Sequence, residues 1–242
     1  MKLPILQVDP ADMPAYAIVC GDPFRAEAIS RKLTDAVELA FAREYRTFVG
    51  EFEGVRIAVT SHGVGAAGAA VCFEELIQAG VRTLIRVGTA GTLTADYPAG
   101  SLIVSTAAVR EEGLTRQLVP LAYPAVADGT IADLLHEKAV QRGGPVGKGI
   151  TVTVDAFYSG VEELPLEKYK RAGALAVEME ISALYVVASL RGARAGAIVA
   201  LDGDATKTDD GYDPHKDLVR EAVHREIDVA LATIAEIARR EH

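Results

Sequence analysis

The sequence predicts an α/β fold in which helices cover both faces of a mixed sheet. Short apolar runs typical of buried strands alternate with longer amphipathic segments, and Gly, Pro or Asp residues separate them. The length of 242 residues is also enough for one large core. Since the sequence contains no repeats, no low-complexity segments and no convincing linker, we expect a single domain spanning residues 1–242.

The elements follow one another in a regular order. Asp22 and Pro23 suit the cap and the first position of a helix, and Glu53-Gly54 suits the turn of a hairpin. We predict strands at residues 16–20, 47–54, 55–60, 83–88, 101–109, 149–154 and 195–201. We predict helices at residues 21–33, 65–80, 131–143, 166–173, 176–187 and 216–240.

Composition excludes several classes of function. With 25 Lys and Arg against 34 Asp and Glu, the net charge is −9, which disfavours nucleic acid and anionic membranes as partners. Apolar runs stay well below the roughly 20 residues of a membrane helix. The N-terminal residues lack a basic region followed by a long apolar one, so we expect no signal peptide and a cytoplasmic location. Cys20 and Cys72 are predicted to be free, buried thiols.

Two junctions between predicted elements could hold an anion. Gly21 follows a strand and permits close approach of the backbone, and Arg25 lies in the first turn of the next helix, beside exposed N–H groups. Arg86 lies inside the apolar run "LIRVG", and Thr89 follows in "GTAG". The alternatives are an ordinary capped helix with a surface arginine and a tight turn after a strand.

Three acids stand out. Glu178 and Glu180 lie in the apolar stretch "AVEMEISALYVV", where carboxylates are rare unless they are paired or bound. The alternative is a solvated first turn of a helix, favoured by the helix dipole. Asp202 follows the predicted strand at 195–201 and is placed for proton transfer. It could also cap nearby backbone, and Asp204 is a competitor for the same role.

The motifs of other functional classes are absent or incomplete. The chain lacks the Gly-Lys-Ser/Thr of a P-loop and the third glycine of a Rossmann fingerprint. Ser61-His62 suggests a hydrolase, but no G-x-S-x-G nucleophile motif accompanies it. The five histidines show no metal-ligand spacing, so we predict no metal site.

Taken together, six motifs resemble those of one family in the same order: "GDPFRAEAI", "AREY", "SHGVGAAGAAVCFEEL", "IRVGTAGTL", "AVEME" and "VALDG". The chain resembles the nucleoside phosphorylases that include bacterial purine nucleoside and uridine phosphorylases, from about residue 16 to the C-terminus. It looks most similar to the parasite-type purine nucleoside phosphorylases. This resemblance implies a three-layer α/β/α fold and a homo-oligomer, commonly a hexamer built as a trimer of dimers.

The resemblance also implies a reaction. It is a pentosyl transfer of purine salvage, in which inorganic phosphate is the co-substrate and no cofactor takes part. The phosphate would be held by Gly21, Arg25, Arg86 and Thr89, together with Arg43 of a neighbouring subunit.

The nucleoside would occupy the rest of the site. By the same resemblance, Glu180 would hold the ribose 2′- and 3′-hydroxyls, with Met179 packing on the sugar and Glu178 nearby. A purine would stack near Tyr158 and Val177. Asp202 would protonate or hydrogen-bond N7 of the leaving base.

Base preference is the open point. Uridine phosphorylases hold uracil with a Gln-x-Arg pair after a Phe-Tyr, whereas this chain has Val161 and Glu163 there, which favours a purine. "PAVAD" (124–128) also occurs in uridine phosphorylases, and Ile5 stands where the family usually has a histidine near the 5′-hydroxyl. The alternatives are therefore a uridine or methylthio-nucleoside phosphorylase and a nucleoside-binding protein on the same fold.

Overall fold

The structure is a computed structural model that describes residues 1–206 and 216–241. Its strands are β1 Tyr16–Cys20, β2 Thr34–Ala42, β3 Tyr45–Phe52, β4 Val55–Ser61, β5 Thr83–Thr92, β6 Leu102–Arg110, β7 Ala125–Val126, β8 Val146–Thr153, β9 Ala176–Glu178 and β10 Arg194–Asp204. Its helices are η1 Pro10–Asp12, α1 Pro23–Ser30, α2 Ala66–Gln78, α3 Leu114–Leu118, α4 Gly129–Gln141, α5 Leu166–Arg171, α6 Ile181–Arg191 and α7 Asp217–Glu241.

Within the described residues, these strands form one mixed sheet. Strands β4, β1, β5 and β10 run parallel in that order, and β2 and β3 extend the sheet beyond β4 by antiparallel pairing. On the other side β10 pairs with β6, and β6 pairs with β8. Short β9 then joins β8 back to the end of β5, so this half of the sheet closes on itself. The carboxyl ends of the parallel strands meet at one edge, where ligands gather in such folds.

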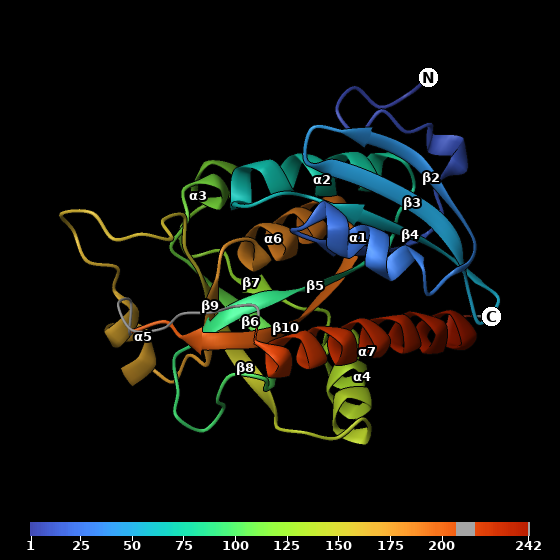
Figure 1. The fold of residues 1–242 in the computed structure, drawn as a ribbon. Coiled ribbons are helices and arrows are strands. Elements are labelled where there is room, and N and C mark those ends of the chain that lie inside the picture. Colours follow the sequence, from blue (N-terminus) through green and yellow to red (C-terminus); the bar gives the residue numbers. More distant parts are fainter. Residues whose placement is uncertain (207–215, 242) are drawn as a thin grey trace.

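Helices cover both faces of the sheet, as the sequence predicts. One hydrophobic cluster joins α2 and α6 to the strands through residues such as Phe73 and Leu184. The other cluster joins α1, α4 and α7 to the opposite face through Ile29, Leu135 and Ile234. Figure 1 shows α2 and α6 on one side of the strands and α4 and α7 on the other. The mixed α/β architecture with a mixed sheet is therefore confirmed.

The predicted helix at 176–187 is wrong at its start. Residues 176–178 form β9, whose backbone pairs with Gly91–Thr92 on one side and with 151–153 on the other. Helix α6 begins only at Ile181, after Glu180 at its cap position. Two ladders of backbone hydrogen bonds outweigh the helical spacing of apolar residues, which local sequence alone cannot reveal.

Two predicted strands are too short. Strand β5 continues past Gly88 to Thr92, and β10 continues past Leu201 to Asp204, because the two strands pair with each other along this whole length. The register shifts between Leu201 and Gly203, so Asp202 is the extra residue of a bulge and lies within the strand, not beyond it.

Strand β2 is absent from our sequence prediction. It is a mostly exposed edge strand, and its run "TDAVELAFA" lacks the buried apolar pattern by which the other strands are recognised. The hairpin turn at Glu53-Gly54 is confirmed between β3 and β4, and both residues have the positive φ values of 51° and 78° that this turn requires. Cys20 and Cys72 are buried and free, as predicted.

Candidate active site

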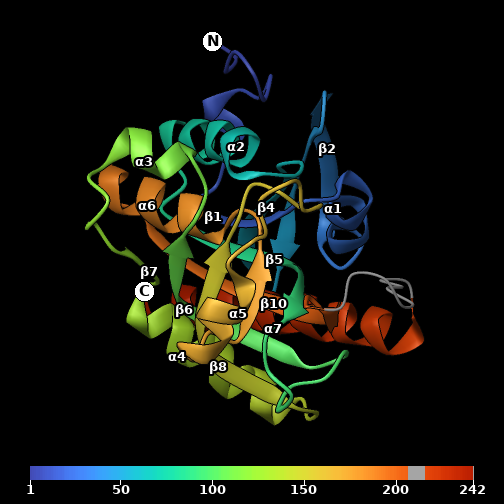
Figure 2. The same ribbon diagram turned by 90° about the vertical axis from the view of Figure 1, so that its left-hand side faces the viewer.

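A cavity of about 1180 Å³ opens at the carboxyl ends of β1, β5 and β10. Of the site residues predicted from the sequence, all but Arg43 line it: Gly21, Arg25, Arg86, Thr89, Tyr158, Val177, Glu178, Met179, Glu180 and Asp202. Figure 2 shows the surrounding elements, with α5 on one side of β5 and α1 on the other. The fold thus brings residues separated by up to 181 positions (202 − 21) to one hollow.

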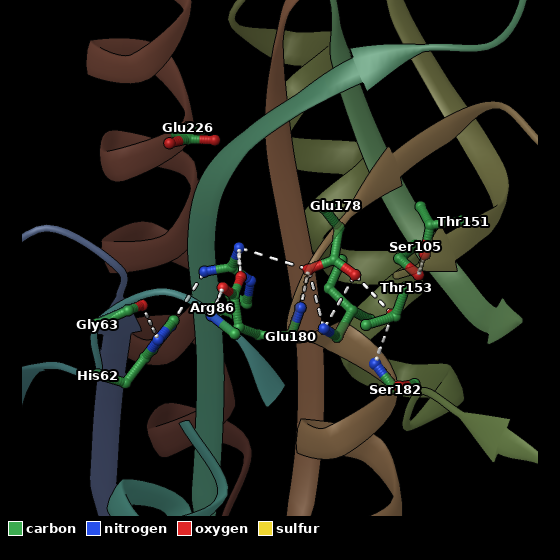
Figure 3. Close-up of polar contacts among 12 residues, drawn as sticks. His62, Gly63, Arg86, Ser105, Thr151, Thr153, Glu178, Glu180, Ser182 and Glu226 are labelled. Atoms are coloured by element: carbon green, nitrogen blue, oxygen red, sulfur yellow. Dashed lines mark hydrogen bonds and ion pairs between the residues drawn. The ribbon is translucent and has the colours of Figure 1, made fainter. Parts of the chain in front are cut away.

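Arg86 is the centre of the polar network in this cavity. It lies on β5 with 3 % of its surface exposed. Its Nη2 donates to Oε2 of Glu180 at 2.6 Å and lies 3.4 Å from Oε2 of Glu178, and its Nη1 donates to Nε2 of His62 at 3.0 Å (Figure 3). Gly88 is required beside it, since a Cβ there would lie 2.9 Å from the guanidinium carbon. Strand β5 and these three partners together fix the orientation of the Arg86 guanidinium.

Glu178 is held almost entirely by the protein. Its carboxylate accepts from the Thr153 hydroxyl at 2.6 Å, from the Glu180 amide at 2.7 Å and from the Ile181 amide at 2.9 and 3.0 Å (Figure 3). These amides open helix α6, so Glu178 serves as a cap from the end of β9. Burial raises the pKa of Glu178 to about 7, and Arg86 opposes that rise.

The Glu180 carboxylate has more free hydrogen-bond acceptor sites than that of Glu178. Its Oε1 accepts from the Gly65 amide at 2.6 Å and its Oε2 from Arg86 at 2.6 Å. A carboxylate offers about four acceptor sites, so two remain for a ligand in the cavity. With 4 % of its surface exposed, Glu180 is not part of a solvated helix end. The alternative of a solvated first turn is wrong for both glutamates.

His62 belongs to the network but is absent from our sequence prediction. It follows β4, is fully buried, and accepts from Arg86 through Nε2. Because a guanidinium can only donate, Nδ1 carries the proton and donates to the Gly63 carbonyl at 2.9 Å. Burial and Arg86 hold the pKa of His62 well below its usual value, so the ring is neutral. The signal in the sequence is a His directly after a strand end, the same feature that suggests a hydrolase.

The anion-binding end is formed by α1 and β5. Asp22 caps α1 by accepting from the Phe24 amide at 2.8 Å, as predicted. Arg25 follows in the first turn and is partly buried, and Thr89 lies at the cavity wall on β5. Glu226 of α7 lies behind Arg25, with Oε1 3.7 Å from its Nη1. This fully buried acid also escaped the sequence prediction, although its place between Ala222 and Ala230 on an apolar helix face is a readable signal.

The two candidate proton donors differ in their surroundings. Asp202 is buried in the bulge of β10, with 5 % of its surface exposed, and lines the cavity. Asp204 is only half-buried, and its Oδ1 accepts from both the amide and the hydroxyl of Thr206. The sequence predicts a long polar loop after Asp204, and residues 207–215 of it lie outside the described residues.

Exposed residues of the segment between β8 and α5 also line the cavity. Phe157 and Tyr158 are 55 % and 85 % exposed, and their rings meet edge to face with centroids 5.0 Å apart. Val161 and Glu163 are exposed and do not line the cavity. Arg43 lies exposed at positive φ in the turn between β2 and β3 and does not line the cavity, whereas its neighbour Glu44 does.

Two kinds of feature are absent from the described residues. Among residues 1–206 and 216–241, no group of three or more His, Cys, Asp or Glu side chains could hold a metal ion. Within the same ranges no helix combines the length and apolarity that crossing a bilayer demands.

Comparison with known proteins identifies the family. Residues 15–240 match the family described as the phosphorylase superfamily. The chain is 36 % identical to a purine nucleoside phosphorylase of Plasmodium falciparum over 235 residues, which cover 96 % of each chain. It is 39 % identical to a uridine phosphorylase of Thermococcus kodakarensis over 204 residues, which cover 79 % of this chain and 74 % of that one.

Solved structures of nucleoside phosphorylases also match this fold. The purine nucleoside phosphorylase of Toxoplasma gondii, in complex with immucillin-H, superposes with a TM-score of 0.95 at 31 % identity, covering 99 % of this chain and 97 % of that one. The chain therefore belongs to the phosphorylase superfamily. It is an enzyme of the nucleoside phosphorylase class, which are pentosyltransferases.

Proposed function

We propose that the enzyme is a purine nucleoside phosphorylase, which cleaves nucleosides such as inosine and guanosine to the free base and ribose 1-phosphate. The observation that carries the purine assignment is Asp202, a buried carboxyl group that lines the cavity. A purine offers N7 as an acceptor for its proton. Neither Val161 nor Glu163 lines the cavity to hold uracil carbonyls.

In this proposal, inorganic phosphate enters at the end formed by Gly21, Arg25, Arg86 and Thr89. These residues combine an accessible backbone, two guanidinium groups and a hydroxyl, which is the chemistry that phosphate needs. A phosphate oxygen attacks the anomeric carbon of the nucleoside, and the bond to the base nitrogen breaks. Asp202 gives its proton to N7, so the base leaves neutral.

Glu180 would bind the ribose. Its two remaining acceptor sites suit the 2′- and 3′-hydroxyls, and its negative charge stabilises the positive character that develops on the sugar as the base departs. Met179 would pack on the sugar, and Val177 and Tyr158 near the base. Glu178 would keep Arg86 and Glu180 in place, since protein donors already fill its oxygens.

The assembly would be a cytoplasmic homo-oligomer, commonly a hexamer in this family, in which Arg43 reaches the phosphate of a neighbouring subunit. Its exposed position in the turn between β2 and β3 supports this role. No cofactor is needed, because phosphate itself is the nucleophile.

A uridine phosphorylase is the second candidate. The similarity to the T. kodakarensis uridine phosphorylase, at 39 % identity, favours it. Incubation of inosine, guanosine, adenosine, uridine and methylthioadenosine with phosphate, followed by quantification of the released bases, separates the two. The proposal expects the purine ribonucleosides to be the best substrates. Faster cleavage of uridine would transfer the assignment to the second candidate, and binding of nucleosides without any turnover would indicate a binding protein.

A further inference from the structure

Glu226 is a buried acid that the reaction just described does not use. It lies on α7 with 0 % of its surface exposed, and neither of its carboxyl oxygens has a hydrogen-bond partner among the described residues. Its nearest ionic group is Arg25, whose Nη1 lies 3.7 Å from Oε1. Arg25 lines the cavity, so one guanidinium lies between the acid and the proposed phosphate site.

A buried carboxyl group without a hydrogen bond must either hold a proton or pair with a cation. The charged or titratable groups that act on it are Arg25 from α1, Arg86 from β5 and the Cys20 thiol from β1. Burial raises the pKa of Glu226 to about 8, although Arg25 and Arg86 oppose that rise. Small changes of charge nearby can therefore change its protonation near neutral pH.

We propose that Glu226 is a positioning residue that pairs with Arg25 while the cavity is empty and takes up a proton from solvent when a dianion binds there. This inference rests on the proposed phosphate site. A dianion beside Arg25 and Arg86 adds negative charge next to the acid, which favours its neutral form. Protonation in turn ends the competition of Glu226 for the Arg25 guanidinium. By linkage, each event must strengthen the other.

Proton uptake can be measured directly with sulfate as the probe. Sulfate keeps two charges from pH 6 to 9, so it contributes no proton of its own. Titration calorimetry in two buffers with different ionisation heats gives the number of protons taken up per sulfate bound. For the wild type we expect almost none at pH 6 and a rising number as the pH passes through about 8. The dissociation constant should rise about tenfold between pH 7 and 9.

Substitutions can show which residue takes up the proton when sulfate binds. Glu226→Gln keeps the shape but cannot ionise, so its proton uptake should vanish and its sulfate affinity should change less than about twofold over the same pH range. Glu236→Gln is the matched control, because Glu236 lies on the same helix and pairs with Arg240 at 2.9 Å at the surface. It should behave as the wild type. Unchanged uptake in Glu226→Gln overturns the inference.

Two further outcomes are informative. Glu178, on the other side of Arg86, is the competing acid. If Glu226→Gln does not fold, Glu178→Gln replaces it: wild-type uptake in that variant supports Glu226, and loss of uptake overturns the inference. Wild-type protein that binds sulfate, displaceable by phosphate, without taking up a proton contradicts this inference alone. Wild-type protein that binds neither anion contradicts the phosphate site and the inference together.

Discussion

The two ends of the cavity are built differently. At the end assigned to phosphate and ribose, Arg86, Glu178 and Glu180 are at most 5 % exposed and hold one another through ion pairs and backbone amides. At the end assigned to the base, Tyr158 is 85 % exposed and projects from the segment between β8 and α5.

This difference separates the reaction from the choice of base. Under the proposed function, the buried end would place the charges that act on phosphate and ribose, whichever base leaves. The exposed end carries few fixed contacts, so substitutions there alter recognition without disturbing the fold. A chain with this arrangement is expected to resemble both purine and uridine phosphorylases, as this one does.

Removing the central charge should have the largest effect. Arg86→Ala leaves Glu178 and Glu180 buried without their cation, which should lower the free energy of unfolding by about 3–5 kcal/mol. The lost contact to phosphate should cost about 2–5 kcal/mol more in catalysis. Urea unfolding and phosphate-dependent kinetics measure the two effects. Arg191→Ala, which breaks an exposed pair with Glu74 at 2.8 Å, is the control and should change stability by about 0–1 kcal/mol.

Loss of Asp202, the proposed proton donor, should have the second largest effect. Asp202→Asn should slow inosine phosphorolysis by about 10²–10⁴-fold, since it removes general acid catalysis. The same variant should lose much less activity on 7-methylguanosine, whose base is already cationic. Asp204→Asn should be milder on both, because Asp204 is tied to Thr206. Steady-state rates on the two substrates test whether Asp202 acts as a general acid. Equal losses on both substrates for Asp202→Asn would show that the residue acts in binding or structure.

Sharing of the site between subunits gives an intermediate effect. If Arg43 serves a neighbour, Arg43→Ala and Asp202→Ala are each impaired alone, but a mixed oligomer contains some sites with both residues intact. Mixing the two variants under conditions of proven subunit exchange should therefore restore part of the activity. Exchange without any recovery would place Arg43 outside the active site.

A substitution at the exposed end of the cavity should have the smallest effect on activity. Tyr158→Ala removes a ring from the base side of the cavity, and an aromatic contact contributes about 0.5–1.5 kcal/mol. We expect the KM for inosine to rise about two- to tenfold, with little change in kcat or in the free energy of unfolding. A large fall in kcat would contradict the separation of the two ends.

The contrast between the two ends also explains what the sequence could predict. Arg86 and Glu180 were recognisable because charges within apolar runs are unusual, and the run itself gives their burial. The alternation of strands and helices was equally readable. Strand β9 and the extension of β10 were not, because both depend on pairing with β5, a partner distant in sequence.

His62 and Glu226 mark the remaining limit. His62 follows the end of a strand and Glu226 lies on an apolar helix face, so each gives a signal in the sequence. The meaning of that signal depends on which residue the side chain faces. His62 faces Arg86 from the end of β4, and Glu226 faces Arg25 from a helix more than 200 positions away (226 − 25 = 201). Only the packed fold brings these partners together.

The most direct measurement is the phosphate dependence of nucleoside cleavage by the purified wild-type protein. Inosine and uridine are incubated separately with and without inorganic phosphate, and free base and ribose 1-phosphate are quantified. The account predicts that inosine is the better substrate, that cleavage needs phosphate, and that base and sugar phosphate appear in equal amounts. Release of base at the same rate without phosphate, or a clear preference for uridine, would contradict it.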